Sequence, residues 1–233
     1  MYRFLLFLAL ALNMLLGAFY PAFSESSLDF WAPVTLDVPL KGETSLRIEV
    51  QNRWDGGQRD YDLIQIRPSI ATTLGSYTTL RGGYLWGRTS PSGDMEHRPW
   101  GEILIEKPLF KKSSVLFVYR QRNELRFFTG SGSPALRTRH LTGLYIPVTQ
   151  KTGVNLNNET LIHLFGNGRV DGGFDQNRTH LGLEHQITPR LSGELAYRFI
   201  MGDQPQSSVS RLRHVIFFQL NYALPSAKTD HHL

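Results

Sequence analysis

Arginine and glutamate occupy every second position in several stretches of this chain. The clearest is Arg120-Gln121-Arg122-Asn123-Glu124-Leu125-Arg126, and Arg137-Thr138-Arg139 follows it. Successive side chains of a β-strand point to opposite faces, so this spacing places the charges on one face of a strand. Guanidinium groups pair with carboxylates through two parallel hydrogen bonds and bind other anions by the same geometry. These residue types therefore point to ion pairing or anion recognition on a common surface.

Two histidines with nearby carboxylates are the candidates for acid–base catalysis. His180 and Glu184 share one face of an expected strand, and Glu159 and His163 share a face of the strand before it. A histidine held by a carboxylate can act as a general base, but nucleophilic catalysis also needs a nucleophile within reach. No serine lies on the apolar face near these residues. We therefore expect no catalytic residues.

The sequence also argues against metals, cofactors and nucleic acid. The chain has no cysteine, which excludes disulfides and thiolate ligands. Asp171 and Asp175 could contribute to a calcium site, but their spacing matches no established ligand loop. The formal net charge is +5 and both signs are mixed along the chain, which is too mild for a nucleic-acid-binding surface. We expect none of these partners.

The elements that must carry these charges are β-strands. Between Arg178 and Ile187, the residues Leu181, Leu183 and Ile187 lie on one parity and the charged residues on the other. The same alternation recurs nearly to the C-terminus, which is typical of a membrane β-barrel. The chain predicts an all-β fold, a transmembrane antiparallel up-and-down β-barrel of ten to twelve strands. The expected strands are 30–39, 44–54, 61–74, 77–89, 98–107, 113–128, 136–148, 153–165, 177–188, 192–201 and 210–223.

The N-terminus reads as a secretory signal peptide over residues 1–24. Arg3 supplies a basic start, Phe4 to Phe19 are mostly apolar, and Ala22-Phe23-Ser24 suits cleavage before Glu25. A membrane helix is the competing interpretation, but the apolar run is short and is interrupted at position 13. Residues 25–233 then form a single barrel domain.

The connections are expected to alternate in length, with short turns on the periplasmic rim. We expect short connections at 74–77, 108–114, 148–153 and 188–190, and longer loops at 55–60, 90–97, 129–134, 166–176 and 202–210. If the strands are counted from the one containing Arg47, there are ten, and the first begins and the last ends on the short-turn rim. The segment 30–40 would be an eleventh strand, which makes the count odd. It is therefore interpreted as a partial strand, an inner plug or half of an unresolved pair of strands.

The two faces of the strands separate cleanly. The lipid-facing set includes Leu46, Ile48, Val50, Ile64, Ile66, Ile70, Leu80, Tyr84, Trp86, Ile103, Ile105, Leu181, Leu183, Ile187, Leu195, Tyr197, Phe199, Ile216, Phe218, Leu220 and Tyr222. The lumen-lining set is Arg47, Glu49, Arg53, Arg67, Arg81, Glu102, Glu106, Arg120, Arg122, Glu124, Arg126, Arg137, Arg139, Glu159, Arg178, His180, Glu184, Glu194 and Arg198. Buried charges must pair or meet water. We therefore expect a narrow lumen laced with salt bridges, and its excess of arginine favours anions.

Several of these motifs together resemble a known family. They are Glu96-His97-Arg98-Pro99-Trp100, the alternating run from Arg120 to Arg126 with Arg137 and Arg139, Asn158-Glu159, and Phe174-Asp175-Gln176-Asn177-Arg178 with Gly182. The chain resembles the bacterial domain of unknown function 2490 family over essentially its whole mature length. The resemblance implies an outer-membrane barrel and carries no assigned activity.

The sequence thus predicts a monomeric barrel in the outer membrane of a Gram-negative bacterium, exported through the periplasm. Its expected partners are outer-membrane lipid, the barrel-assembly machinery and small anionic solutes, with a structural or passive-channel function. One alternative is an outer-membrane lipid-modifying enzyme, in which replacing His180 or Glu159 would abolish turnover. Another is a soluble periplasmic β-sandwich, which would stay monodisperse without detergent.

Overall fold

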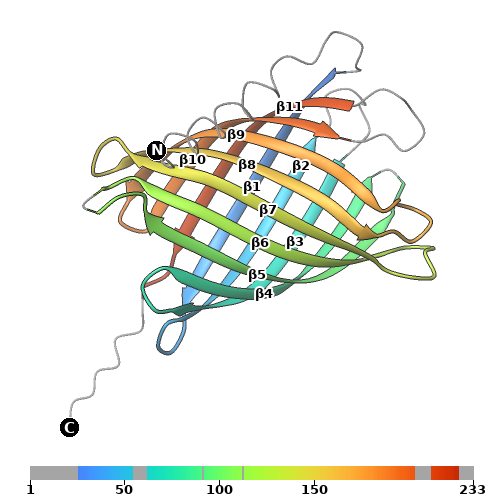
Figure 1. The fold of residues 1–233 in the computed structure, drawn as a ribbon, viewed down its shortest axis with the longest axis horizontal. Helices are drawn as coiled ribbons and strands as arrows, with labels where there is room; N and C mark the ends of the chain where they lie inside the picture. The colour runs from blue at the N-terminus through green and yellow to red at the C-terminus, as the bar shows by residue number, and fades with distance from the viewer. Residues whose placement is uncertain (1–25, 55–61, 91, 112, 203–210, 226–233) are drawn as a thin grey trace.

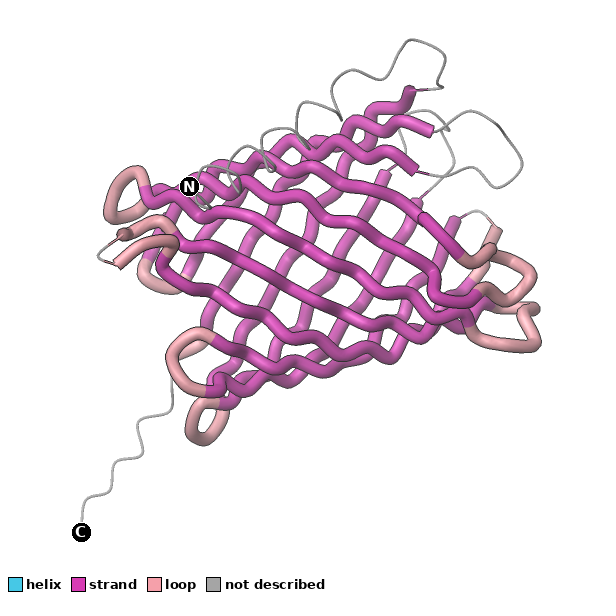
Figure 2. Tube along the Cα trace, in the orientation of Figure 1, coloured by secondary structure: helices cyan, strands magenta, loops and turns pink. Residues whose placement is uncertain are grey.

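The protein is a closed β-barrel (Figures 1 and 2). The structure, a computed structural model, describes residues 26–54, 62–90, 92–111, 113–202 and 211–225. Its eleven strands are β1 (Ser26–Pro39), β2 (Thr44–Trp54), β3 (Asp62–Leu74), β4 (Thr78–Ser90), β5 (Met95–Pro108), β6 (Leu116–Phe128), β7 (Ala135–Pro147), β8 (Thr152–Phe165), β9 (Gly173–Thr188), β10 (Leu191–Gly202) and β11 (Arg211–Ala223). The predicted all-β barrel of ten to twelve strands is confirmed. The described residues contain no helix long and apolar enough to cross a membrane. The expected signal peptide, the loops around 55–60 and 203–210 and the C-terminal tail lie outside the described residues.

The segment left open by the sequence forms a complete strand, β1, which closes the barrel. β1 pairs antiparallel with β2 and parallel with β11. The even count with both ends on one rim is therefore wrong. An odd number of alternating strands leaves the first and last pointing the same way, so their closure must be parallel. The parallel pairing runs from Ser26 to Trp31 and resumes at Val34; Pro33, which has no N–H to donate, lies in the gap.

The two rims of the barrel carry different connections. The C-terminal rim, where β11 ends, holds 40–43, 75–77, 109–115, 148–151 and 189–190, and the loop rim holds 91–94, 129–134 and 166–172. Two of the predicted connection lengths were wrong. The connection expected to be long at 90–97 is short, because β5 already begins at Met95, and the connection after Pro108, expected to be short, spans 109–115. β5 begins earlier than expected, at Met95 rather than at position 98, since Met95 already pairs with Arg88 and the Thr89 N–H donates to the Asp94 carbonyl at 2.9 Å.

Apolar side chains are exposed on the outside over much of the barrel. Leu183, Leu195 and Phe218 lie side by side on β9, β10 and β11, and each is about half exposed, at 52%, 59% and 49%. Ile66 on β3 and Ile103 on β5 are likewise exposed. Water does not favour such a surface, because large contiguous apolar patches are rare on soluble monomers.

The outward face of β6 to β9 is polar near the middle of the strands. Asn158 and Asn177 exchange amide hydrogen bonds of 2.8 and 3.0 Å, and Gln121 donates to Asn123 at 2.9 Å. We call this surface the polar outer face, and it comprises Gln121, Asn123, Thr138, His140, Asn158, Thr160, Asn177 and Thr179. Its side chains hydrogen-bond one another across neighbouring strands. The lipid-facing set predicted from the sequence contains no residue of β6, β7 or β8.

The interior holds a small apolar cluster beside a large charged region. Trp31, Ala196, Ile200, Val215 and Phe217 are buried together on β1, β10 and β11. Elsewhere the inward positions of the strands are mostly occupied by buried charged and polar side chains. The barrel therefore positions a charged lumen inside a largely apolar exterior.

Candidate functional site

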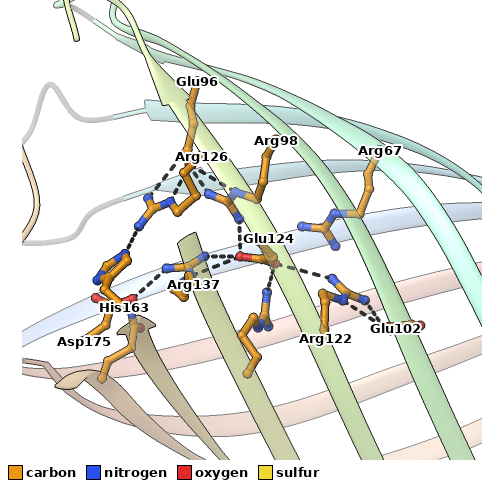
Figure 3. A network of polar contacts seen from close by, with 12 residues as sticks. Arg67, Glu96, Arg98, Glu102, Arg122, Glu124, Arg126, Arg137, His163 and Asp175 are labelled. Carbon is orange, nitrogen blue, oxygen red and sulfur yellow. Dashed lines mark hydrogen bonds and ion pairs between the residues drawn. The ribbon is translucent and has the colours of Figure 1, made fainter. Parts of the chain in front are cut away.

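The centre of the charged lumen is Glu124 on β6, whose side chain is 1% exposed (Figure 3). Arg137 and Arg139 on β7 donate to its two carboxylate oxygens at 2.6 and 2.7 Å. Arg98 on β5 approaches at 3.3 Å and Arg122 at 3.8 Å. Strand register explains the convergence, because Arg137 lies directly opposite Glu124 across β6 and β7. Four guanidinium groups therefore share one carboxylate.

Two further glutamates extend this network around the barrel wall. Glu102 on β5 accepts from Arg122 Nε at 2.7 Å and from Arg81 at 2.9 Å. Glu159 on β8 accepts from Arg139 Nε and Nη2, both at 2.9 Å, in the bidentate geometry that suits a guanidinium. The network of Glu102, Glu124 and Glu159 with their arginines is called the central network below.

Trp100 supports the central network from β5. The guanidinium of Arg122 lies 4.1 Å from the centroid of its indole ring. A Cβ atom at Gly83 would stand 2.8 Å from Trp100 Cζ2, so only glycine lets the ring lie this close to β4. The cation–π contact and the ion pairs together hold Arg122 in one orientation.

The predicted lumen-lining set omits several residues that the structure places in the site near the loop rim; of these, His163 was named only as a candidate for acid–base catalysis. Glu96 accepts from Arg98 Nη2 at 2.7 Å and from Arg126 Nε at 2.6 Å. Asp175 accepts from Arg137 at 2.6 Å, and His163 lies 2.9 Å from Arg126 Nη1. Glu96 and Arg98 share the parity of Glu102. Glu96 was omitted because β5 was expected to begin at 98, whereas Arg98 lay inside the expected strand and its parity was a signal that could have found it. Asp175 was assigned to a loop.

Two more ion pairs lie outside the central network. Arg47 donates to Asp37 at 2.6 and 2.8 Å, and Arg67 donates to Glu49 at 2.8 Å. The predicted lumen-lining set also omits Asp37, because the sequence did not decide whether the segment that forms β1 is a strand of the barrel. These pairs leave the inner wall charged on β1, β2 and β3 as well.

His180, one of the two histidines considered for catalysis, has different neighbours from those expected. His180 Nε2 lies 3.1 Å from Glu194 Oε1, and Arg198 Nη2 lies 3.2 Å from His180 Nδ1. Glu184 lies opposite Glu194 on the neighbouring strand rather than beside His180. A Cβ atom at Gly182 would collide with the Glu194 carboxylate, so this glycine makes room for the pair. The described residues contain no cluster of three or more metal-ligating side chains.

Two cavities occupy the lumen on either side of the central network. The larger, about 470 Å³, contains these predicted lumen residues in its wall: Arg47, Glu49, Arg53, Arg67, Arg81, Glu102, Glu106, Arg120, Arg122, Arg139, Glu159, Arg178, His180, Glu194 and Arg198. The smaller, about 280 Å³, lies toward the loop rim and adds Arg126 and Arg137. Glu184 lines neither cavity. Arg53, Arg139 and Arg178 border both cavities, so the charged side chains stand between them.

An exposed ion pair ties the loop rim together. Arg169 donates to Asp94 at 2.8 Å and to the Thr129 carbonyl at 3.2 Å, which joins three connections. The hydrogen bond from Arg169 lowers the pKa of Asp94 below its usual 3.8. The ion pair therefore stabilises the loops fully at pH values above the pKa that Asp94 has in the unfolded chain. This stabilisation is lost as the pH falls through the lower pKa that Asp94 has in the folded protein.

We expect acid to loosen this loop contact selectively. Limited proteolysis at the 166–172 connection should accelerate as the pH falls through the lowered pKa of Asp94, because the protonated carboxyl loses its ion pair with Arg169. The Asp94→Asn variant should be cut faster than the unaltered protein at neutral pH and show little further change with acid. Equal cleavage of the two proteins at neutral pH would contradict a role for this pair. The protease must be one that remains active in acid.

Comparison with known proteins identifies the family of this chain. No curated protein and no solved structure matches it. The family model described as "Protein of unknown function (DUF2490)" matches residues 28–211. The match runs from β1 to the first residue of β11 and includes every acidic residue of the central network. The chain therefore belongs to the DUF2490 family of proteins of unknown function.

Proposed function

We propose that this protein is an outer-membrane β-barrel that admits small anions through its arginine-rich lumen. The observation that carries the proposal is the inverted polarity of the barrel. Leu183, Leu195 and Phe218 are exposed outside, while Glu124 and its arginines are buried inside. A soluble barrel or sandwich would bury the apolar set and expose the charges. A bilayer is the solvent that favours the arrangement seen here.

The preference for anions rests on uncompensated arginines. Among the described residues, neither Arg53 nor Arg198 forms an ion pair with a carboxylate, and Arg178 is 3.5 Å from a glutamate already held by Arg139. Rings of arginine in a pore lower the energy of an anion and raise that of a cation. The central network keeps the lumen narrow at rest, so the permeant solutes must be small.

The polar outer face is compatible with this setting. Its amides and hydroxyls hydrogen-bond one another, as Asn158 and Asn177 do. Mutual hydrogen bonding lowers the cost of placing neutral polar groups in hydrocarbon, whereas an unpartnered group would be costly there.

The proposed location follows from the expected export signal and the barrel together. A secretory signal over residues 1–24 would carry the chain to the periplasm, and the barrel-assembly machinery would insert it among outer-membrane lipids. A closed barrel has no unpaired strand edge, so it can stand in the membrane as a monomer. We propose no catalytic step, because the carboxylates near His180 and Glu159 are engaged by arginines or by His180 itself.

Membrane insertion and anion flux can be tested with one preparation. The folded protein should migrate differently on a gel before and after boiling, as closed barrels do, and should fold into phosphatidylcholine vesicles. Chloride efflux from these vesicles should exceed that from protein-free vesicles. A protein that stays monodisperse without detergent would instead support the soluble periplasmic alternative. Inserted protein with no efflux would overturn the transport proposal and leave a structural barrel.

A further inference from the structure

An arginine cluster around Trp31 has few carboxylate partners: among the described residues, only Arg178 lies near one, at 3.5 Å from Glu159. Arg53, Arg198 and Arg178 lie 3.9, 5.2 and 5.5 Å from the centroid of the Trp31 ring. The three residues come from β2, β10 and β9, which the closed barrel brings together around β1. The indole face compensates a cation only partly. Three guanidinium groups thus share a small region of the lumen.

The hydrogen-bond partners of these arginines are neutral or weak. Arg53 donates to Gln51 at 2.8 Å, and its buried Nε has no partner among the described residues. Arg178 donates from Nε to Gln176 at 2.8 Å, and Arg198 Nη2 lies 3.2 Å from His180 Nδ1. Guanidinium N–H donors therefore remain available around Trp31, where few carboxylates balance the positive charge of the arginines.

The cavity toward the loop rim provides the space for a ligand. Arg53 and Arg178 line it together with Gln65, which is 3% exposed and whose Oε1 has no hydrogen-bond partner within the described part of the chain. Of the described residues in this wall, Asp94 and Glu96 are acidic, and arginines already pair with both. The volume of about 280 Å³ is ample for a tetrahedral oxyanion with some water.

We propose that Arg53 and Arg178 form a binding site for a small soluble oxyanion of the phosphate class, at the junction of the two cavities. The planar guanidinium fork matches two oxygens of a tetrahedral anion, and an amide such as Gln65 can complete the shell. A bound oxyanion would also relieve repulsion among the three arginines. A role of this site in the passage of anions through the lumen rests on the proposed function, whereas oxyanion binding by Arg53 and Arg178 does not depend on it.

A structural arginine and a ligand-binding arginine respond differently to substitution. Because Arg53 has no carboxylate partner among the described residues, Arg53→Gln leaves none of their buried carboxylates unpaired. In phosphate-free buffer its midpoint of unfolding should therefore equal or exceed that of the unaltered protein. Added phosphate should raise the midpoint of the unaltered protein, because a ligand that binds only the folded state stabilises it, and should barely move that of Arg53→Gln.

The deciding experiment is calorimetric titration of the full folded protein in detergent with sodium phosphate, repeated with sulfate and with chloride at matched ionic strength. We expect saturable binding of phosphate, and affinity about tenfold weaker in Arg53→Gln, since it loses a charge-assisted hydrogen bond. Arg53→Lys, which keeps the charge but loses the fork, should fall between the two. Arg190→Gln, in the exposed turn before β10, should bind like the unaltered protein.

Three outcomes would overturn the site. They are no saturable heat with phosphate, equal weakening in Arg53→Gln and Arg190→Gln, and chloride binding as strong as phosphate binding, which would reveal only a diffuse positive potential. The test is separable from that of the proposed function. Phosphate binding without chloride efflux would support the site and reject transport. Chloride efflux without phosphate binding would support transport and reject the site.

Discussion

Glu124→Gln should lower the free energy of unfolding by about 3–5 kcal/mol, the cost of breaking a buried ion pair by removing one partner. The glutamine loses the negative charge that faces Arg98, Arg122, Arg137 and Arg139. These guanidinium groups would then repel one another in a region where the Glu124 side chain is 1% exposed. The measurement is the urea midpoint of protein folded into vesicles, with the slope checked for two-state behaviour.

Glu106→Gln is the matched control for this substitution. Glu106 lines the larger cavity and is exposed, and it forms no ion pair among the described residues. Its replacement should change stability by less than about 0.5 kcal/mol, as expected for a surface site. Equal effects of the two glutamine variants would mean that the central network does not stabilise the barrel.

Leu183→Arg should cost about 2–4 kcal/mol when the protein is folded in a bilayer, as a cation does on the lipid face near the midplane. Leu183 is 52% exposed on the outside of β9, beside Leu195 of β10. At this position in a bilayer, the introduced guanidinium would lie in hydrocarbon, where neither water nor a carboxylate can compensate its charge. The comparison again uses urea midpoints in vesicles.

Ile187→Arg provides the control on the same strand and the same face. Ile187 is also 52% exposed but lies next to the C-terminal rim, at the end of β9. The cost there should fall to about 0–1 kcal/mol, because the side chain can reach the interface. If both variants were as stable as the unaltered protein, the outer surface would face water and the membrane proposal would fail.

The strands and their faces could be predicted because period-two alternation is a local property of the sequence. Leu181 and Leu183 alternate with His180 and Glu184 within a few residues, and the structure places the leucines outside. The family resemblance also came from short motifs that the family model then matched. The polar outer face was missed because polar residues occur on both parities of β6 to β8, so alternation there is weak.

Closure and ion-pair partners could not be predicted because they depend on contacts between distant segments. β1 and β11 are separated by nearly the whole chain, and only the odd strand count forces their parallel pairing. His180 has Glu194 as its partner rather than Glu184, since register brings β10 beside it. Arg98 and Arg139 reach Glu124 from opposite neighbours of β6, a meeting that no local spacing reveals.

The reversal potential of the folded protein in a planar bilayer under a KCl gradient tests the central claim most directly. We predict discrete conductance steps whose reversal potential has the sign set by chloride, and a shift toward zero in Arg198→Gln, which removes an uncompensated lumen charge. A reversal potential set by potassium, or a folded and inserted barrel that carries no current, would contradict an anion-admitting lumen.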